Sequence, residues 1–169
     1  MNTPTILCVD DERIVLVSLR DQLRQFLGQN YEIELAETGE EALELLQELQ
    51  TEAVEIPLVI SDQIMPGMRG DELLAKVHQS LPRTLTILLT GHANAEDIGN
   101  AVNAANLHRY VTKPWNPEDL QLTVQNALQR YAQNQQCQLQ NMQLHQINQQ
   151  LEQMNALLEE KVAARTREF

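Results

Sequence analysis

Four short apolar runs in this sequence each end at a polar residue suited to magnesium or phosphate chemistry. The runs at 6–9, 58–61, 86–89 and 110–112 are followed, in that order, by Asp10 and Asp11, by Asp62, by Thr90 and by Lys113. In an open parallel sheet, ligands bind beyond the carboxyl ends of the strands. We therefore expect these side chains to meet in one site although they lie far apart in the sequence.

The acidic members of this set predict a site for a divalent cation. Asp10 and Asp11 are adjacent, and Asp62 would lie across the predicted sheet from them. Carboxylates held close together repel one another, and a bound cation relieves that repulsion. Mg²⁺ prefers one or two carboxylates together with water and phosphate oxygens. We predict that Asp10, Asp11 and Asp62 hold Mg²⁺.

The remaining chemistry is that of phosphoryl transfer. Asp62 is the candidate nucleophile, which would form an aspartyl phosphate. Lys113 carries an ammonium group on a long stem that can reach a phosphate oxygen, and Thr90 offers a hydroxyl to another. Backbone N–H groups near Ile64 and Gly91 would supply further donors, and glycine at position 91 lets the chain approach a ligand closely.

The elements that would position these residues alternate along the first two thirds of the chain. Strands are expected at 5–9, 31–36, 58–61, 86–89 and 109–112, and helices at 12–27, from the capping box at Thr38 through Leu49, at 71–80, at 95–105 and from 117 onward. Short apolar strands separated by helices indicate an α/β fold, a doubly wound parallel sheet covered on both faces. The right-handed crossover rule leaves few arrangements, and we favour the flavodoxin-like order 2-1-3-4-5. The strand at 31–36 alternates most clearly, which suits a sheet edge.

The last third of the chain predicts a long helix that pairs with a second copy. No glycine or proline follows Pro117, and apolar residues recur at 3-4-3-4 spacing, as in a two-stranded coiled coil. These residues are Leu144, Ile147, Leu151, Met154 and Leu158. Beyond Leu158 the frame shifts to Val162, Thr166 and Phe169, like a stutter. We expect a homodimer through residues 144–166.

One section of this expected helix has two interpretations. Residues 132–150 contain no Asp, Glu, Lys or Arg and are rich in Gln and Asn. Such a composition is typical of a flexible polar linker. Gln is nevertheless a fair helix former and nothing in the section breaks a helix, so we favour continuous helix.

Composition excludes several classes of partner. The net charge is −12, which argues against non-specific binding of nucleic acid or anionic membranes. No apolar run approaches the roughly 18 residues of a membrane span, and the N-terminus lacks the basic region of a signal peptide. Cys8 and Cys137 cannot form a disulfide framework, so a reduced, cytoplasmic location is expected.

Residues 4 to about 128 resemble the receiver domain of response regulators from bacterial two-component systems. The matching motifs are Val-Asp-Asp-Glu (9–12), Asp-Gln-Ile-Met-Pro-Gly-Met (62–68), Leu-Thr-Gly-His (89–92) and Thr-Lys-Pro-Trp (112–115). The resemblance implies that Asp62 accepts a phosphoryl group from a histidine kinase or phosphotransfer protein. It also implies that the backbone carbonyl of Ile64 joins the magnesium ligands, and that Thr90 and Tyr110 form a switch pair.

On this interpretation residues 4–128 are a receiver domain and residues 129–169 a helical signalling linker. The expected function is a phosphorylation-controlled module without enzymatic activity, whose output passes through the helix. A receiver dimer with a forward-projecting helix favours parallel pairing, although the sequence leaves the orientation open.

The sequence also bears on three other functions. Residues 158–169 resemble linkers that precede catalytic domains of histidine kinases, cyclic-dinucleotide enzymes and protein phosphatases, so we expect this chain to be a piece of a longer protein. A phosphatase with an aspartyl nucleophile needs a second Asp two residues later, where this chain has Ile64. A DNA-binding regulator lacks support, because no helix-turn-helix or basic stretch follows residue 128.

Overall fold

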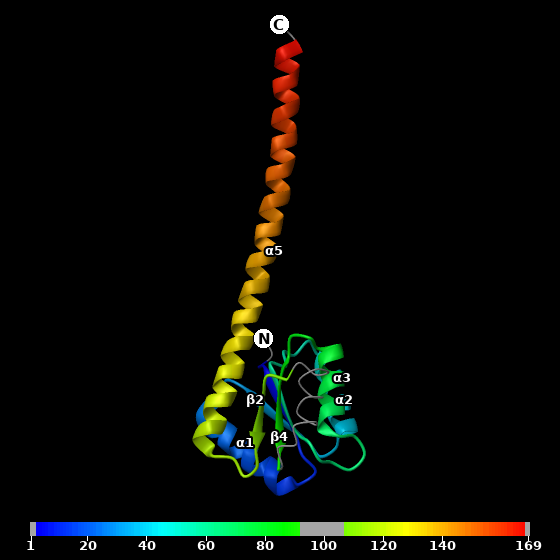
Figure 1. Cartoon of the computed structure of the whole chain (residues 1–169), viewed down its shortest axis with the longest axis vertical. Coiled ribbons are helices and arrows are strands. Elements are labelled where there is room, and N and C mark those ends of the chain that lie inside the picture. Colours follow the sequence, from blue (N-terminus) through cyan, green and yellow to red (C-terminus); the bar gives the residue numbers. More distant parts are fainter. Residues whose placement is uncertain (1–2, 92–106, 168–169) are drawn as a thin grey trace. The chain divides into compact units, whose positions relative to one another are not determined.

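A five-stranded parallel sheet with helices on both faces forms the first part of the chain (Figure 1). The computed structural model describes residues 3–91 and 107–167. The strands are β1 Thr5–Val9, β2 Glu32–Ala36, β3 Leu58–Asp62, β4 Leu85–Thr90 and β5 Arg109–Thr112. Their order is β2-β1-β3-β4-β5, and every neighbouring pair is parallel, which confirms the predicted topology.

The helices lie close to the positions that the apolar spacing predicts. They are α1 Arg13–Leu27, α2 Gly39–Thr51, α3 Gly70–Ser80 and α5 Pro117–Arg167. The helix expected at 95–105 lies outside the described residues.

Each face of the sheet carries its own apolar layer. On one face, alternate residues of the central strands pack with α1 and with the start of α5, including Leu16, Leu19, Leu120 and Val124. On the other face, the intervening residues pack with α2 and α3. A strand buried on both sides is mostly apolar, which is why consecutive residues of β1 and β3 are apolar from Ile6 to Val9 and from Leu58 to Ile60 instead of alternating with polar ones. In β2, Glu32 and Glu34 are exposed around buried Ile33, as expected of an edge strand.

Local hydrogen bonds explain where several helices begin and end. Thr38 Oγ1 accepts the Glu41 N–H at 3.0 Å, whereas the Glu41 carboxylate accepts from Glu37 N–H at 3.1 Å, one residue before the partner that a capping box uses. Asn116 Oδ1 accepts the Glu118 N–H at 2.9 Å at the start of α5. Gly28 ends α1 with φ of 65°, a conformation that glycine adopts without strain.

By its internal contacts the chain divides into two units, Met1–Tyr131 and Ala132–Phe169. α5 spans Pro117–Arg167 without interruption, so the charge-free section 132–150 is helical, as we favoured. Every side chain from 136 to 166 is exposed. Among the described residues, no helix combines the length and apolar content needed to cross a bilayer.

The two cysteines differ in accessibility, and this difference can be measured. Cys8 is fully buried in β1, and burial raises the pKa of its thiol, whereas Cys137 is exposed on α5. Because the thiolate is the reactive species, an aromatic disulfide reagent should label no thiol of a Cys137→Ser variant in the native state and one thiol in denaturant. Labelling of this variant in the native state would contradict the buried position of Cys8.

Candidate functional site

The carboxylates of Asp10, Asp11 and Asp62 converge at one edge of the sheet. In the β1–β3 ladder Val9 pairs with Ser61, so the next residues, Asp10 and Asp62, emerge side by side. One carboxylate oxygen from each of the three aspartates lies within 4.8 Å of the others. Asp10 is fully buried, Asp62 is nearly so, and Asp11 is exposed to solvent. The predicted acidic cluster is therefore present in the structure.

Lys113 lies between two of these carboxylates. Its Nζ is 2.7 Å from Asp10 Oδ2 and 3.1 Å from Asp62 Oδ1. The strand ladder brings it there, because β5 pairs with β4 and the Lys113 N–H donates to the Thr90 carbonyl at 2.8 Å. Lys113, which the sequence predicts to contact a phosphate, thus also offsets part of the charge of Asp10 and Asp62.

Burial and charge act against each other on these groups. Burial raises the pKa of Asp62, and the neighbouring Asp10 charge raises it further, while the hydrogen bond and charge of Lys113 lower it, leaving the pKa raised. Burial alone would lower the pKa of Lys113, but its hydrogen bonds and ion pairs with Asp10 and Asp62 outweigh burial and raise it. Lys113 therefore stays protonated, and the cluster favours additional positive charge next to Asp62.

The donor set fits a magnesium ion. All three side chains offer hard carboxylate oxygens, and bonds of 2.0–2.1 Å to an octahedral Mg²⁺ place ligand oxygens roughly 3–4 Å apart. The spacing within 4.8 Å needs only a small contraction to reach that geometry. The exposure of Asp11 leaves one side of the cluster open to water and to a phosphate group.

Gln63, which sequence reasoning missed, holds the Asp62 carboxylate in place. Its backbone N–H donates to Asp62 Oδ1 at 3.0 Å and to the Leu89 carbonyl at 2.9 Å. Its buried side chain accepts the Asp71 N–H at 3.0 Å in the first turn of α3. A polar residue directly after a strand-end aspartate is the only sequence signal, and that signal also fits an ordinary loop residue.

Gly70, the first residue of α3, was missed as well. Its N–H donates to the Gln63 carbonyl at 3.0 Å. A Cβ atom at this position would overlap the backbone carbonyl oxygen of Asp62. The close approach of α3 to the end of β3 therefore requires glycine here.

The other predicted residues occupy varied surroundings. Thr90 is buried at the end of β4, whereas Ile64 is 69% exposed just after β3. Tyr110 pairs with Leu88 across β4 and β5 and is 46% exposed, so its predicted role as a switch stays a prediction. Gly91 is exposed, and a Cβ there would meet no atom within 4 Å, so packing among the described residues does not require glycine at that position.

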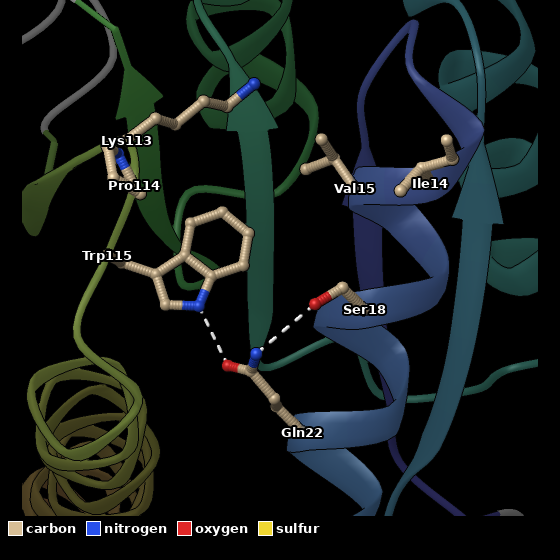
Figure 2. A pocket seen from close by; sticks show the side chains of 7 residues that line it. All are labelled: Ile14, Val15, Ser18, Gln22, Lys113, Pro114 and Trp115. Carbon is tan, nitrogen blue, oxygen red and sulfur yellow. Dashed lines mark hydrogen bonds between the residues drawn. The ribbon is translucent and has the colours of Figure 1, made fainter.

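A pocket of about 440 Å³ adjoins the site on the α1 side (Figure 2). Residues of α1 and of the segment after β5 line it: Ile14, Val15, Ser18, Gln22, Lys113, Pro114 and Trp115. The Trp115 indole N–H donates to Gln22 Oε1 at 2.8 Å, and the Gln22 amide donates to Ser18 Oγ at 3.3 Å. This chain of hydrogen bonds ties the segment after Lys113 to α1.

Comparison with known proteins is consistent with this geometry. Residues 6–125 match the family model described as the response regulator receiver domain. The chain is 33% identical over 125 residues to the hydrogenase transcriptional regulatory protein HoxA of Cupriavidus necator, covering 74% of this chain and 24% of HoxA. It is 33% identical over 132 residues to the aerobic respiration control protein ArcA of Escherichia coli K12, covering 77% of this chain and 50% of ArcA. The chain thus spans about a quarter to a half of the length of these relatives.

Solved structures with the same fold include isolated receiver domains. The signal receiver domain of an HD domain-containing protein from Pseudomonas fluorescens Pf-5 aligns with a TM-score of 0.69 and 35% identity, covering 78% of this chain and 99% of that one. A CheY-like receiver domain protein from Methanospirillum hungatei JF-1 aligns with a TM-score of 0.68 and 33% identity, covering 79% and 99%.

The Gly70 contact yields a prediction about stability. Gly70→Ala should destabilise the protein by about 1–3 kcal/mol, because the added methyl group must push α3 away from the Asp62 backbone. Urea denaturation followed by circular dichroism measures the change. Gly91→Ala is the matched control and should alter stability by less than about 0.5 kcal/mol. Equal effects of the two substitutions would show that the Asp62–Gly70 approach is not tight.

Proposed function

Since this chain belongs to the response regulator receiver domain family, a signalling module of two-component systems, we propose that Asp62 is its phosphoacceptor. The phosphoryl donor would be the phosphohistidine of a histidine kinase or phosphotransfer protein. One observation carries the proposal: a nearly buried carboxylate lies 3.1 Å from a lysine ammonium and beside two further carboxylates that can hold a cation. The sensor kinase CckA of Brucella abortus is among the relatives, at 30% identity over 126 residues.

The Asp62 carboxylate is oriented for attack by its hydrogen bond from the Gln63 N–H. In the transfer step, an Asp62 carboxylate oxygen forms a bond to phosphorus while the phosphorus–nitrogen bond of the donor phosphohistidine breaks. The leaving imidazole keeps the bonding electron pair and takes up a proton from solvent. Asp62 thereby becomes an aspartyl phosphate, and the chain does the work of positioning and charge balance.

Lys113 and Thr90 would contact the negatively charged oxygens of the new phosphoryl group. The Lys113 ammonium already lies against Asp62 Oδ1 and can move onto a phosphoryl oxygen without changing its backbone position. The Thr90 carbonyl accepts the Lys113 N–H, so the backbones of the two residues are held next to each other. The Thr90 hydroxyl would then donate to another phosphoryl oxygen.

Magnesium would be held by Asp10, Asp11, Asp62 and the Ile64 carbonyl. When bound, Mg²⁺ offsets the negative charge that builds on the phosphoryl oxygens during transfer. Asp10 is the ligand fixed most firmly by the fold, because it is fully buried and its Oδ1 accepts the Glu12 N–H at 2.9 Å. Asp11 completes the set from the solvent side.

The phosphorylation signal would be transmitted by α5, which would pair with α5 of a second copy. Phosphorylation would shift the Thr90 and Tyr110 pair, and α5 begins within five residues of β5, which carries Tyr110. We propose that the shift changes the pairing of α5 with a second copy through residues 144–166.

A second candidate role is regulation of a catalytic domain on a longer polypeptide. This chain spans about a quarter of HoxA, and relatives include a cyclic di-GMP phosphodiesterase of Thermotoga maritima, at 31% identity over 125 residues. The comparisons are compatible with this role without favouring it. Reading the coding sequence past the Phe169 codon is the test.

Phosphorylation of Asp62 is directly measurable. Incubation with acetyl phosphate and Mg²⁺ should add one phosphoryl group to the intact protein, as seen by mass spectrometry. Asp62→Asn, which keeps the side-chain size but removes the nucleophile, should add none. A mass gain that survives in Asp62→Asn would place the modification elsewhere.

Magnesium binding should be visible as stabilisation. At a concentration 100-fold above its Kd, Mg²⁺ should raise the free energy of unfolding by about 2.7 kcal/mol, because it binds only the folded cluster. Asp11→Asn should reduce this gain at equal Mg²⁺ by weakening affinity. Glu12→Gln, the same charge change one residue later, should keep it. Thermal unfolding with and without Mg²⁺ measures both, and equal gains in the two variants would remove Asp11 from the ligand set.

A further inference from the structure

The Ala132–Phe169 unit carries an apolar stripe that it cannot bury by itself. Within this unit one helix is described, and side chains on a single helix all lie at its surface. The stripe consists of Leu144, Ile147, Leu151, Met154 and Leu158, whose exposed fractions are 58%, 51%, 52%, 59% and 56%. Helices in proteins gain most of their stability from packing such a stripe against a partner.

The charge pattern favours an identical chain as that partner. With Leu144 taken as position a of a seven-residue repeat, the flanking e and g positions from 141 to 157 are all uncharged: Asn141, Gln143, Asn148, Gln150, Asn155 and Leu157. Charges at these positions normally select a partner of opposite sign. Because they are neutral here, two identical copies meet no repulsion along the seam, even though the whole chain carries a net charge of −12. The acids Glu152, Glu159 and Glu160 fall on the outer b and c positions.

The same repeat extends upstream to the exposed cysteine. Positions a recur at Cys137, Leu144, Leu151 and Leu158. Between the first two lies Gln140 at position d, whose amide can both donate to and accept from its counterpart in an aligned pair. Downstream, the next d position is Lys161, where two ammonium groups would face each other. The frame shift to Val162 avoids that contact and marks the end of the regular seam.

We infer that two copies of α5 pair parallel and in register, with Cys137 facing Cys137 of the second copy. This inference rests on the proposed pairing of α5 with a second copy. It adds the orientation of the two helices, their register and the first layer of the seam. In parallel register every seam layer is formed by identical residues. In the antiparallel arrangements that place a positions opposite d positions along the stripe, Leu144 lies opposite Met154 or Lys161, so the two Cys137 residues lie roughly 36 to 47 Å apart, at about 1.5 Å per residue.

Cys137 is therefore a native probe of the arrangement. A disulfide needs Cα atoms within about 7 Å, which facing a positions satisfy. On the outer f position the Cα atoms of two paired helices are roughly 13 Å apart, from an interaxial distance of about 9 Å and a Cα radius of about 2.3 Å. Cys8 does not interfere because it is fully buried.

The experiment is crosslinking of the full chain with diamide, without added phosphate donor. Diamide takes up two electrons and two protons as two thiols become one disulfide, and non-reducing electrophoresis reports the covalent dimer. The wild-type chain should crosslink, and Cys137→Ser should lose the dimer band. Cys137→Ser combined with Leu144→Cys, one repeat downstream on the seam, should restore it. Cys137→Ser combined with Met142→Cys, at an outer f position, should not.

A paired charge substitution tests the seam itself. Leu151→Glu places two carboxylates face to face in the seam and should abolish the Cys137 crosslink and give a monomeric mass by light scattering. Gln149→Glu adds the same charge on the outer f position and should leave both unchanged. Equal crosslinking at positions 137 and 142, or a dimer by light scattering without a Cys137 crosslink, would overturn the parallel in-register arrangement, as would a monomeric wild type. Since crosslinking is measured without a phosphate donor and phosphorylation by mass, failure of either proposal is seen separately.

Discussion

The structure depends on two buried carboxylates held side by side at the end of a parallel sheet. The β1–β3 register forces Asp10 and Asp62 together, and the burial of both makes their mutual repulsion strong. In the part of the chain that the structure describes, both form their ion pairs with Lys113. One ammonium for two carboxylates, with a third at the rim, leaves net negative charge at this edge. That imbalance favours additional positive charge at this edge, as a divalent cation would supply.

The backbone behind these side chains is as constrained as the side chains themselves. Gln63 links β3, β4 and α3 through hydrogen bonds. Its N–H donates to the Asp62 carboxylate and the Leu89 carbonyl, and its side chain accepts the N–H of Asp71 in the first turn of α3. Gly70 allows that turn to lie directly on the Asp62 carbonyl. A movement of Asp62 on phosphorylation would therefore also displace the groups of α3 and β4 that contact Asp62 and Gln63. Rigid elements hold the site, as accurate positioning of a reacting carboxylate requires.

The sheet and the acidic cluster could be predicted because each depends on local pattern. Apolar runs that end in polar residues identify strand ends, and parallel topology then brings Asp10, Asp62 and Lys113 together regardless of their separation. The roles of Gln63 and Gly70 could not be predicted, because they arise from how closely α3 approaches β3, a distance that no periodicity encodes. The direct ion pair between Lys113 and Asp10 was missed for a similar reason. The type and position of Lys113 predict contact with a phosphate, whereas in the folded chain its ammonium group also offsets the buried charge of Asp10 and Asp62.

The same lysine also lies close in sequence to α5. Three residues separate Lys113 from Pro117, the first residue of α5, and Trp115 among them bonds to Gln22 of α1. Leu120 of α5 is fully buried in the layer beneath the sheet, so the first turns of the helix cannot shift without disturbing the core. A lysine drawn from Asp10 toward a phosphoryl group would leave Asp10 without its ammonium partner, while the Lys113 backbone stays bonded to the Thr90 carbonyl. Because packed interfaces change between discrete arrangements rather than deforming smoothly, any change in the position of α5 on the core would then be a switch and not a gradual displacement. Because α5 runs without interruption from Pro117 to Arg167, such a switch would reach the stripe that we propose pairs with a second copy.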